Sequence, residues 1–146
     1  MRFSSHAIVF FIVLLTIPLA GAGLDIHVPS LPAISTFFSA SHQAVQTSVT
    51  VYLLGYGVGQ LIVGTVSDSV GRRPVLLLGA LLYVVGCLLS VFASTMTVFL
   101  LSRLIQGFAV AGPGIAAKAC MSDCFSGKAL QKKSSYLVIA WAAGPI

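Results

Sequence analysis

The sequence predicts an all-α protein embedded in a membrane, a polytopic bundle of four transmembrane helices followed by the start of a fifth. Of its 146 residues, 58% are hydrophobic and only 8% are charged, whereas about 25% are charged in an ordinary soluble domain. The mean hydropathy is +1.04. The apolar residues fall into runs of about 20, the length at which a helix crosses a hydrocarbon core of about 30 Å.

The same composition excludes several other classes of protein. Eight basic and three acidic side chains are too few to cover a soluble globule, and the hydrophobicity is too high for a disordered chain. The net charge of +5 forms no basic face, so we expect no nucleic-acid partner. Cys87, Cys120 and Cys124 have no disulfide or zinc-site spacing. We find no catalytic set, metal site or cofactor motif, and therefore expect no enzyme.

The predicted spans follow one another as apolar runs with few charges, and the lipid bilayer is their expected partner. They cover residues 7–24, 45–66, 74–93, 97–119 and, incompletely, 136–146. The first run also fits a secretory signal peptide, because a basic start precedes it and small residues end it. The further spans, and a run that continues unbroken to Leu24, favour a membrane helix.

The fifth run is too short to span. Residues 136–146 rise only about 16 Å as a helix, roughly half of a hydrocarbon core of about 30 Å. A chain end within lipid would leave backbone groups without partners. We therefore expect a truncated product or a partial gene model.

The basic residues predict the orientation. Loops 25–44 and 94–96 contain no Lys or Arg, and the positive-inside rule places basic loops in the cytoplasm. We therefore expect a cytoplasmic N-terminus and an outward-facing loop 25–44. Seven of the eight basic residues fall on the predicted cytoplasmic side: Arg2, Arg72, Arg73, Lys118, Lys128, Lys132 and Lys133.

A glycine- and charge-containing loop joins the second and third spans. A short hairpin explains most of it, because Gly71 suits a tight turn and Pro74 suits the first turn of a helix. The hairpin does not explain Asp68, which can pair with Arg72 or meet a helix N-terminus. The candidate loop motif comprises Gly64, Asp68, Gly71, Arg72 and Arg73.

This stretch resembles the G-x-x-x-D-(R/K)-x-G-(R/K)-(R/K) loop motif of major facilitator superfamily transporters, and Ser69 departs from the basic residue usual after the acid. The resemblance implies that residues 1–146 are a partial N-terminal transmembrane domain, part of the N-terminal half of a major facilitator fold. Members of that family alternate access by rocking two such halves.

Arg103 lies inside the fourth span, where a bare arginine is costly and is a candidate for function. The alternative is snorkelling, with Arg103 about 9 Å inside the expected outer end. Together with Gln106 it forms a stretch similar to the R-x-x-Q-G motif of proton antiporters in the superfamily. The resemblance implies a role for Arg103 and Gln106 in proton transfer.

Asp25 closes the first span at a depth similar to that of Arg103, so the two side chains are candidates for a proton-dependent ion pair. The alternative is a helix-end acid exposed to water. The residues that follow resemble the D-x-x-x-P-x-x-P segment of bicyclomycin-resistance-like drug:proton antiporters. We expect His27 and His42 to be solvated loop residues, with a proton relay as the alternative.

Small residues recur at a spacing that lets membrane helices pack closely. Gly55 and Gly59 lie in the second span, and Gly107 and Ala111 lie in the fourth. We expect these four to serve packing. Gly112-Pro113-Gly114 is expected to bend the fourth span.

The resemblance implies a multi-pass protein of the cell inner membrane that, once completed, exports drugs or other small molecules in exchange for protons. It implies no cofactor. The alternative is a non-transporting truncated membrane protein, either a remnant or a subunit that needs a second chain to supply the missing helices. A homodimeric small exporter is a weaker alternative, because Asp25 is too near the surface to face a dimer interface.

Overall fold

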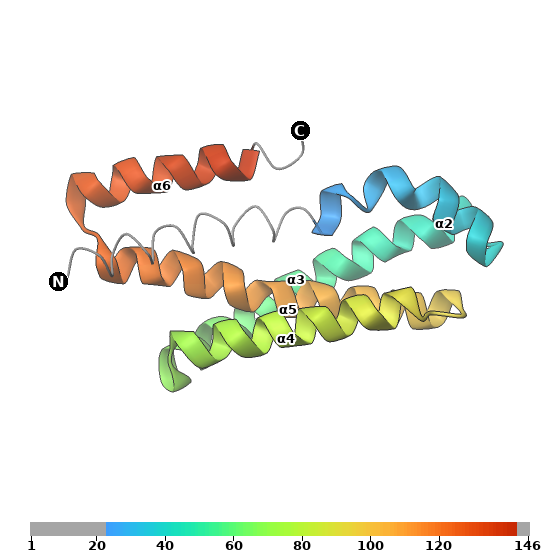
Figure 1. The fold of residues 1–146 in the computed structure, drawn as a ribbon, viewed down its shortest axis with the longest axis horizontal. Coiled ribbons are helices and arrows are strands. Elements are labelled where there is room, and N and C mark those ends of the chain that lie inside the picture. Colours follow the sequence, from blue (N-terminus) through green and yellow to red (C-terminus); the bar gives the residue numbers. More distant parts are fainter. Residues whose placement is uncertain (1–22, 143–146) are drawn as a thin grey trace.

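The computed structural model describes residues 23–142, and residues 1–22 and 143–146 lie outside the described part. The regular elements within it are all helical, which confirms the predicted all-α fold. In chain order (Figure 1) they are the 3-10 helix η1 (Val28–Ser30) and the α-helices α2 (Leu31–Phe38), α3 (His42–Val70), α4 (Arg72–Val91), α5 (Met96–Cys124) and α6 (Gly127–Ala142).

Three described segments are long and apolar enough to cross a membrane: α3, α4 and Met96–Ile115 of α5. They correspond to the second, third and fourth predicted spans. The first predicted span, except for its last two residues, lies outside the described part of the chain. So does the end of the fifth.

Helix α5 is the centre of the bundle. Both α3 and α4 pack along α5 and touch each other little (Figure 1). In the most apolar stretch of α5, 56% of the residues are buried, whereas 17% are buried in the corresponding stretch of α3 and of α4. The outer faces of α3 and α4 expose large side chains such as Leu61 and Leu81, as expected of helices that face lipid.

Local signals set the helix boundaries. Helices α3 and α5 are capped by the preceding Ser41 and Thr95, whose hydroxyl oxygens accept hydrogen bonds from Ala44 N–H at 3.2 Å and Val98 N–H at 3.3 Å. Such N-caps satisfy backbone donors that the helix cannot. Gly71 alone joins α3 to α4 with φ +99°, a conformation that favours a residue without a β-carbon.

Small residues lie where α3 meets α5. Gly55 lies against the Leu104 carbonyl, and Gly107 lies against the Tyr52 carbonyl. A β-carbon added at Gly59 would lie 2.8 Å from the Ala111 β-carbon. The two helices therefore meet backbone to backbone, which larger side chains at these positions would prevent.

Helical structure extends beyond the predicted spans in three places. Residues 25–44, expected to form a loop, contain η1 and α2, because their mixed polar and apolar residues fit a short helix but no membrane span. Helix α6 begins at Gly127 rather than near Tyr136, and α5 ends at Cys124 rather than near Ala119. In both cases polar helical turns extend an apolar run. Helix α5 also continues through Pro113.

Candidate functional site

Arg103 is buried at the centre of the bundle, with only 5% of its surface exposed. Its Nη1 donates a hydrogen bond to Gln106 Oε1 at 2.6 Å, and its Nη2 donates to the Gly23 carbonyl at 3.2 Å. The guanidinium carbon lies 4.6 Å from the centre of the Tyr52 ring, within the range of a cation–π interaction. The side chain therefore points into protein and does not snorkel outward.

Gln106 joins this arginine to the neighbouring helix α4. Its Nε2 donates to the Gly86 carbonyl at 3.0 Å, while its Oε1 accepts from Arg103. A β-carbon at Gly86 would lie 2.8 Å from Gln106 Cγ, so a glycine is needed for this approach. Gly86 was not predicted from the sequence, although an isolated glycine within an apolar helix is a signal of close packing.

The structure does not bring Asp25 into an ion pair with Arg103. The described structure shows ion pairs of Arg72 with Asp68 and Asp123. The Gly23 carbonyl, two residues before Asp25, accepts from the guanidinium instead. Asp25 itself is partly exposed. In this conformation the two proposed coupling residues are separate.

His27 is buried, so the expectation of a solvated loop residue was wrong. The segment before α2 folds back onto the bundle, and His27 Nε2 lies 2.8 Å from Ser48 Oγ. Ser48 donates its own proton to the Val45 carbonyl, so the imidazole proton lies on Nε2. Burial, assisted by the positive charge of Arg103, lowers the pKa of His27 from 6.5 to about 4. His42, in contrast, is an exposed first residue of α3.

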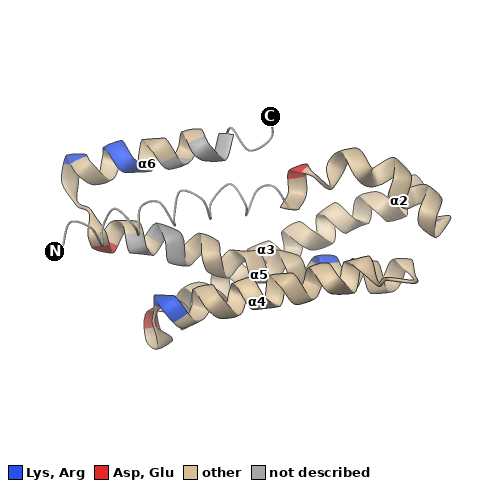
Figure 2. Cartoon of the chain, in the orientation of Figure 1, with Lys and Arg blue, Asp and Glu red and all other residues tan. Residues whose placement is uncertain are grey.

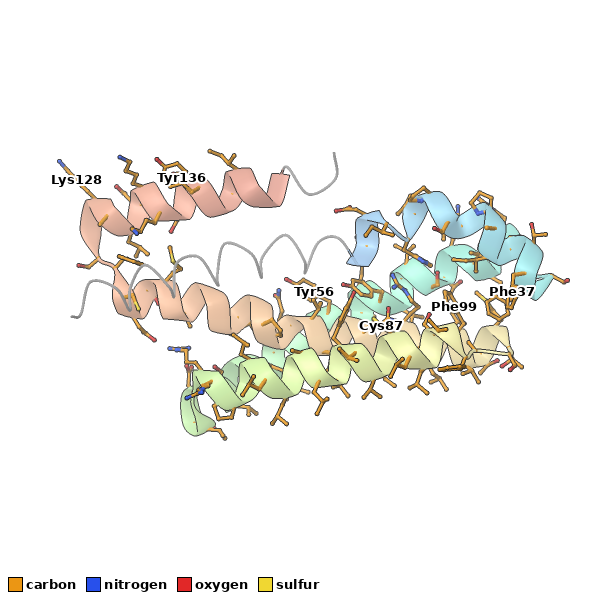
Figure 3. All side chains as sticks on the ribbon, viewed as in Figure 1. Phe37, Tyr56, Cys87, Phe99, Lys128 and Tyr136 are labelled. Atoms are coloured by element: carbon orange, nitrogen blue, oxygen red, sulfur yellow. The ribbon has the colours of Figure 1, made fainter. Side chains whose placement is uncertain are left out.

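A cavity of about 750 Å³ adjoins these polar groups. Its described walls come from residues 23–34, α4 and α5, and they are mostly aliphatic. Cys87 and Phe99, labelled in Figure 3, mark its position in the bundle. The volume falls within the range of about 300–1,000 Å³ typical of small-molecule sites. The polar and aromatic members include His27, Tyr83, Phe99, Arg103 and Gln106.

A second polar cluster lies at the end of the bundle where α4 begins (Figure 2). Arg72 Nε donates to Asp123 Oδ2 at 2.9 Å, and its Nη1 donates to Asp68 Oδ1 at 3.4 Å. Arg72 thus ties the end of α3 to the end of α5. Asp123 belongs to the last turn of α5.

Two members of the loop motif make no comparable contact with the described residues. Arg73 is exposed, and no atom lies within 4 Å of the position a β-carbon would take at Gly64. No described segment therefore approaches Gly64 closely in this conformation.

Comparison with known proteins identifies the family. The model of the Major Facilitator Superfamily matches residues 10–146. The uncharacterized MFS-type transporter YdgK of Bacillus subtilis is 36% identical over 140 residues, which cover 96% of this chain and 35% of that protein. Multidrug resistance protein D of Escherichia coli is 31% identical over 121 residues, covering 83% of this chain and 31% of that protein.

A bicyclomycin resistance protein homolog of Haemophilus influenzae is 31% identical over 124 residues, covering 85% of this chain and 31% of that protein. The chain spans about a third of the length of these curated relatives. The relatives are named as transporters or resistance proteins rather than enzymes, in agreement with the expectation from the sequence. With its long apolar helices packed around a buried arginine, the chain is a multi-pass membrane protein of the Major Facilitator Superfamily.

Proposed function

We propose that this chain is the N-terminal portion of a proton-coupled exporter of drugs or other small molecules. The relatives named for multidrug and bicyclomycin resistance support the class of substrate. The chain's match to about a third of their length supports its being one portion of a longer transporter. The expected setting is the cell inner membrane.

The observation that carries the proposal is the buried Arg103 beside a cavity of about 750 Å³. An intramembrane arginine is unfavourable unless it is paired or serves a pathway for ions or substrate. Here its hydrogen bonds hold it in one orientation through Gln106 and Gly23. A fixed cation at the wall of a cavity suits the control of a nearby proton acceptor.

Asp25 is the proton acceptor that this proposal assigns to the chain. It lies two residues from Gly23, whose carbonyl accepts from Arg103. A small movement of this segment would exchange the carbonyl for the carboxylate. Ionised Asp25 would then pair with Arg103, and protonation would release it. Transport requires two such states, and the structure supplies one in which the pair is open.

The charge distribution supports a cytoplasmic N-terminus. The ion pairs of Arg72 and the lysines at the start of α6 share one end of the described bundle (Figure 2). Since basic residues favour the cytoplasmic side, that end faces the cytoplasm. We infer that the Arg72 contacts with Asp68 and Asp123 hold the helix ends together in one conformation of the transport cycle.

Drug accumulation in cells tests this proposal. The longest reading frame that contains this chain is expressed in a bacterial host that lacks its own efflux pumps, as wild type, Asp25→Asn and Arg103→Ala. We expect the wild type to lower drug accumulation, and both variants to lose this effect while still inserting in the membrane. Proton-coupled efflux retained in both variants would refute the proposed relay.

The second candidate is a membrane protein that does not transport by itself. This candidate applies if the 146 residues are made as a separate chain, since they cover about a third of the length of the relatives. Sequencing the transcript beyond the codon for Ile146 separates the two candidates. Further spans in frame favour the exporter. A stop codon, with no neighbouring frame that encodes the remaining helices, favours the non-transporting protein, whereas such a neighbouring frame favours a two-chain transporter.

A further inference from the structure

The cavity beside α4 and α5 has an unusual charge balance. Among its described lining residues, Arg103 is the one with a formal charge. The remaining walls are mostly aliphatic, with Leu76, Ala80 and Val84 of α4 on one side. A molecule in this cavity would therefore meet one cation and an apolar surface.

Among the described residues, none serves as a counterion for that cation in this conformation. The whole sequence contains three acidic residues: Asp25, Asp68 and Asp123. Asp68 and Asp123 pair with Arg72 at the end of the bundle where α4 begins. Asp25 forms no ion pair with Arg103 and is not among the described lining residues. The positive charge of Arg103 is thus unbalanced within the described structure.

The guanidinium also has unused hydrogen-bonding capacity. A guanidinium carries five N–H donors, and Arg103 makes two hydrogen bonds to described residues, both to neutral carbonyl oxygens. Its Nε is buried and has no partner. A buried charge without a counterion is strongly unfavourable, and a guanidinium binds best to an oxyanion that accepts two parallel N–H hydrogen bonds.

We propose that the cavity binds a small amphipathic anion, whose carboxylate, sulfonate or phosphate lies against Arg103 and whose apolar body lies along α4. This inference deepens the proposed function by naming a class of substrate, and as a substrate claim it rests on that function. As a binding site it can be tested without transport. The cavity excludes organic cations by the same charge.

Three probes that share the same anthracene ring system and differ in charge test the inference. The 146-residue chain in nanodiscs of zwitterionic lipid is titrated with 9-anthracenecarboxylate, with its methyl ester and with (9-anthracenylmethyl)trimethylammonium, and anthracene fluorescence reports binding. We expect the carboxylate to bind at least about tenfold more tightly than the ester, since removing one partner of a buried charge pair has effects of this size or larger. We expect the ammonium probe to bind most weakly.

Variants assign the preference to Arg103. Arg103→Met should bring carboxylate and ester to equal affinity, and Arg103→Lys should keep part of the preference because it keeps the charge. Lys128→Met removes an exposed charge on α6 and should change nothing. Equal affinities of the wild type for carboxylate and ester would overturn the inference, and this result does not depend on whether any variant folds. An unchanged preference in a folded Arg103→Met chain would overturn it as well.

The source of the anion and the link to transport are tested separately. If phosphatidylglycerol added to the nanodiscs displaces the carboxylate probe, a lipid headgroup is the anion that occupies the site. If it does not, the site takes a free small molecule. Anion binding without efflux would leave the site in place and remove the proposed function. Efflux of cations with no anion binding would support the proposed function and remove the anion site.

Discussion

Replacing Gly107 by alanine should strongly weaken the contact between α3 and α5. A β-carbon at this position would overlap the Tyr52 carbonyl oxygen and lie 3.0 Å from the Tyr56 backbone nitrogen. These are backbone atoms and cannot rotate away, so the two helices must separate by about 1 Å. A gap of that order removes roughly a quarter to a half of each dispersion contact along the seam.

The expected loss of unfolding free energy follows from this geometry. Overpacking in a close-packed core costs about 1–3 kcal/mol, and a clash between two backbones belongs at the upper end, so we expect about 3 kcal/mol for Gly107→Ala. The matched control is Gly57→Ala, because no atom lies within 4 Å of that added β-carbon. The control should be neutral or stabilising by up to about 1 kcal/mol, since alanine favours helix.

The free energy of unfolding can be measured by SDS titration in mixed micelles, with near-ultraviolet circular dichroism as the signal of tertiary packing. An unfolding free energy of Gly107→Ala within about 0.5 kcal/mol of the wild-type value, the effect of an ordinary surface substitution, would refute the predicted backbone clash. An equal loss of unfolding free energy in Gly57→Ala would also contradict the prediction, because the loss would then not arise from the contact between α3 and α5.

Two further predictions concern the ends of the bundle. His27 is kept neutral in the folded chain because its pKa falls from 6.5 to about 4, so the unfolded chain binds more protons between these values. Stability should therefore decrease as the pH falls from 6.5 toward 4, and His27→Gln should flatten this slope in a pH series of thermal melts; an equal slope in both proteins would contradict the assignment. A double-mutant cycle of Arg72→Ala and Asp123→Ala should give a coupling energy of about 0.2–1 kcal/mol, because the pair is partly exposed. That coupling should shrink at high salt, and a salt-independent value would show that the ion pair is not its source.

The sequence was informative about features that stand out against an apolar background. The long apolar runs predicted α3, α4 and α5, and an arginine within one of them marked the residue at the centre of the bundle. The small residues at positions 55, 59, 107 and 111 marked the seam of α3 and α5. These signals are local, because each depends on residue type and spacing within one helix.

The Gly23 carbonyl that accepts from Arg103 and the Gly86 carbonyl that accepts from Gln106 were not predictable in the same way. Both belong to segments distant in the sequence from their donors, and any residue has a carbonyl, so residue type does not identify an acceptor. His27 was misassigned for a related reason: a histidine after a predicted span suggests a solvated loop, whereas its burial depends on residues 23–30 folding back to Ser48. Helix α2 was missed because its eight residues are too few to form a run long enough for a membrane span.

The most direct test of the account is drug-driven proton flux in everted membrane vesicles that contain the longest reading frame with this chain. Addition of substrate should release protons from respiring vesicles that express the wild type or Lys128→Met, as a drug:proton exchange requires. Arg103→Ala vesicles, with equal protein in the membrane, should release none. Equal proton release by wild type and Arg103→Ala would contradict the central claim that the buried arginine couples protons to export.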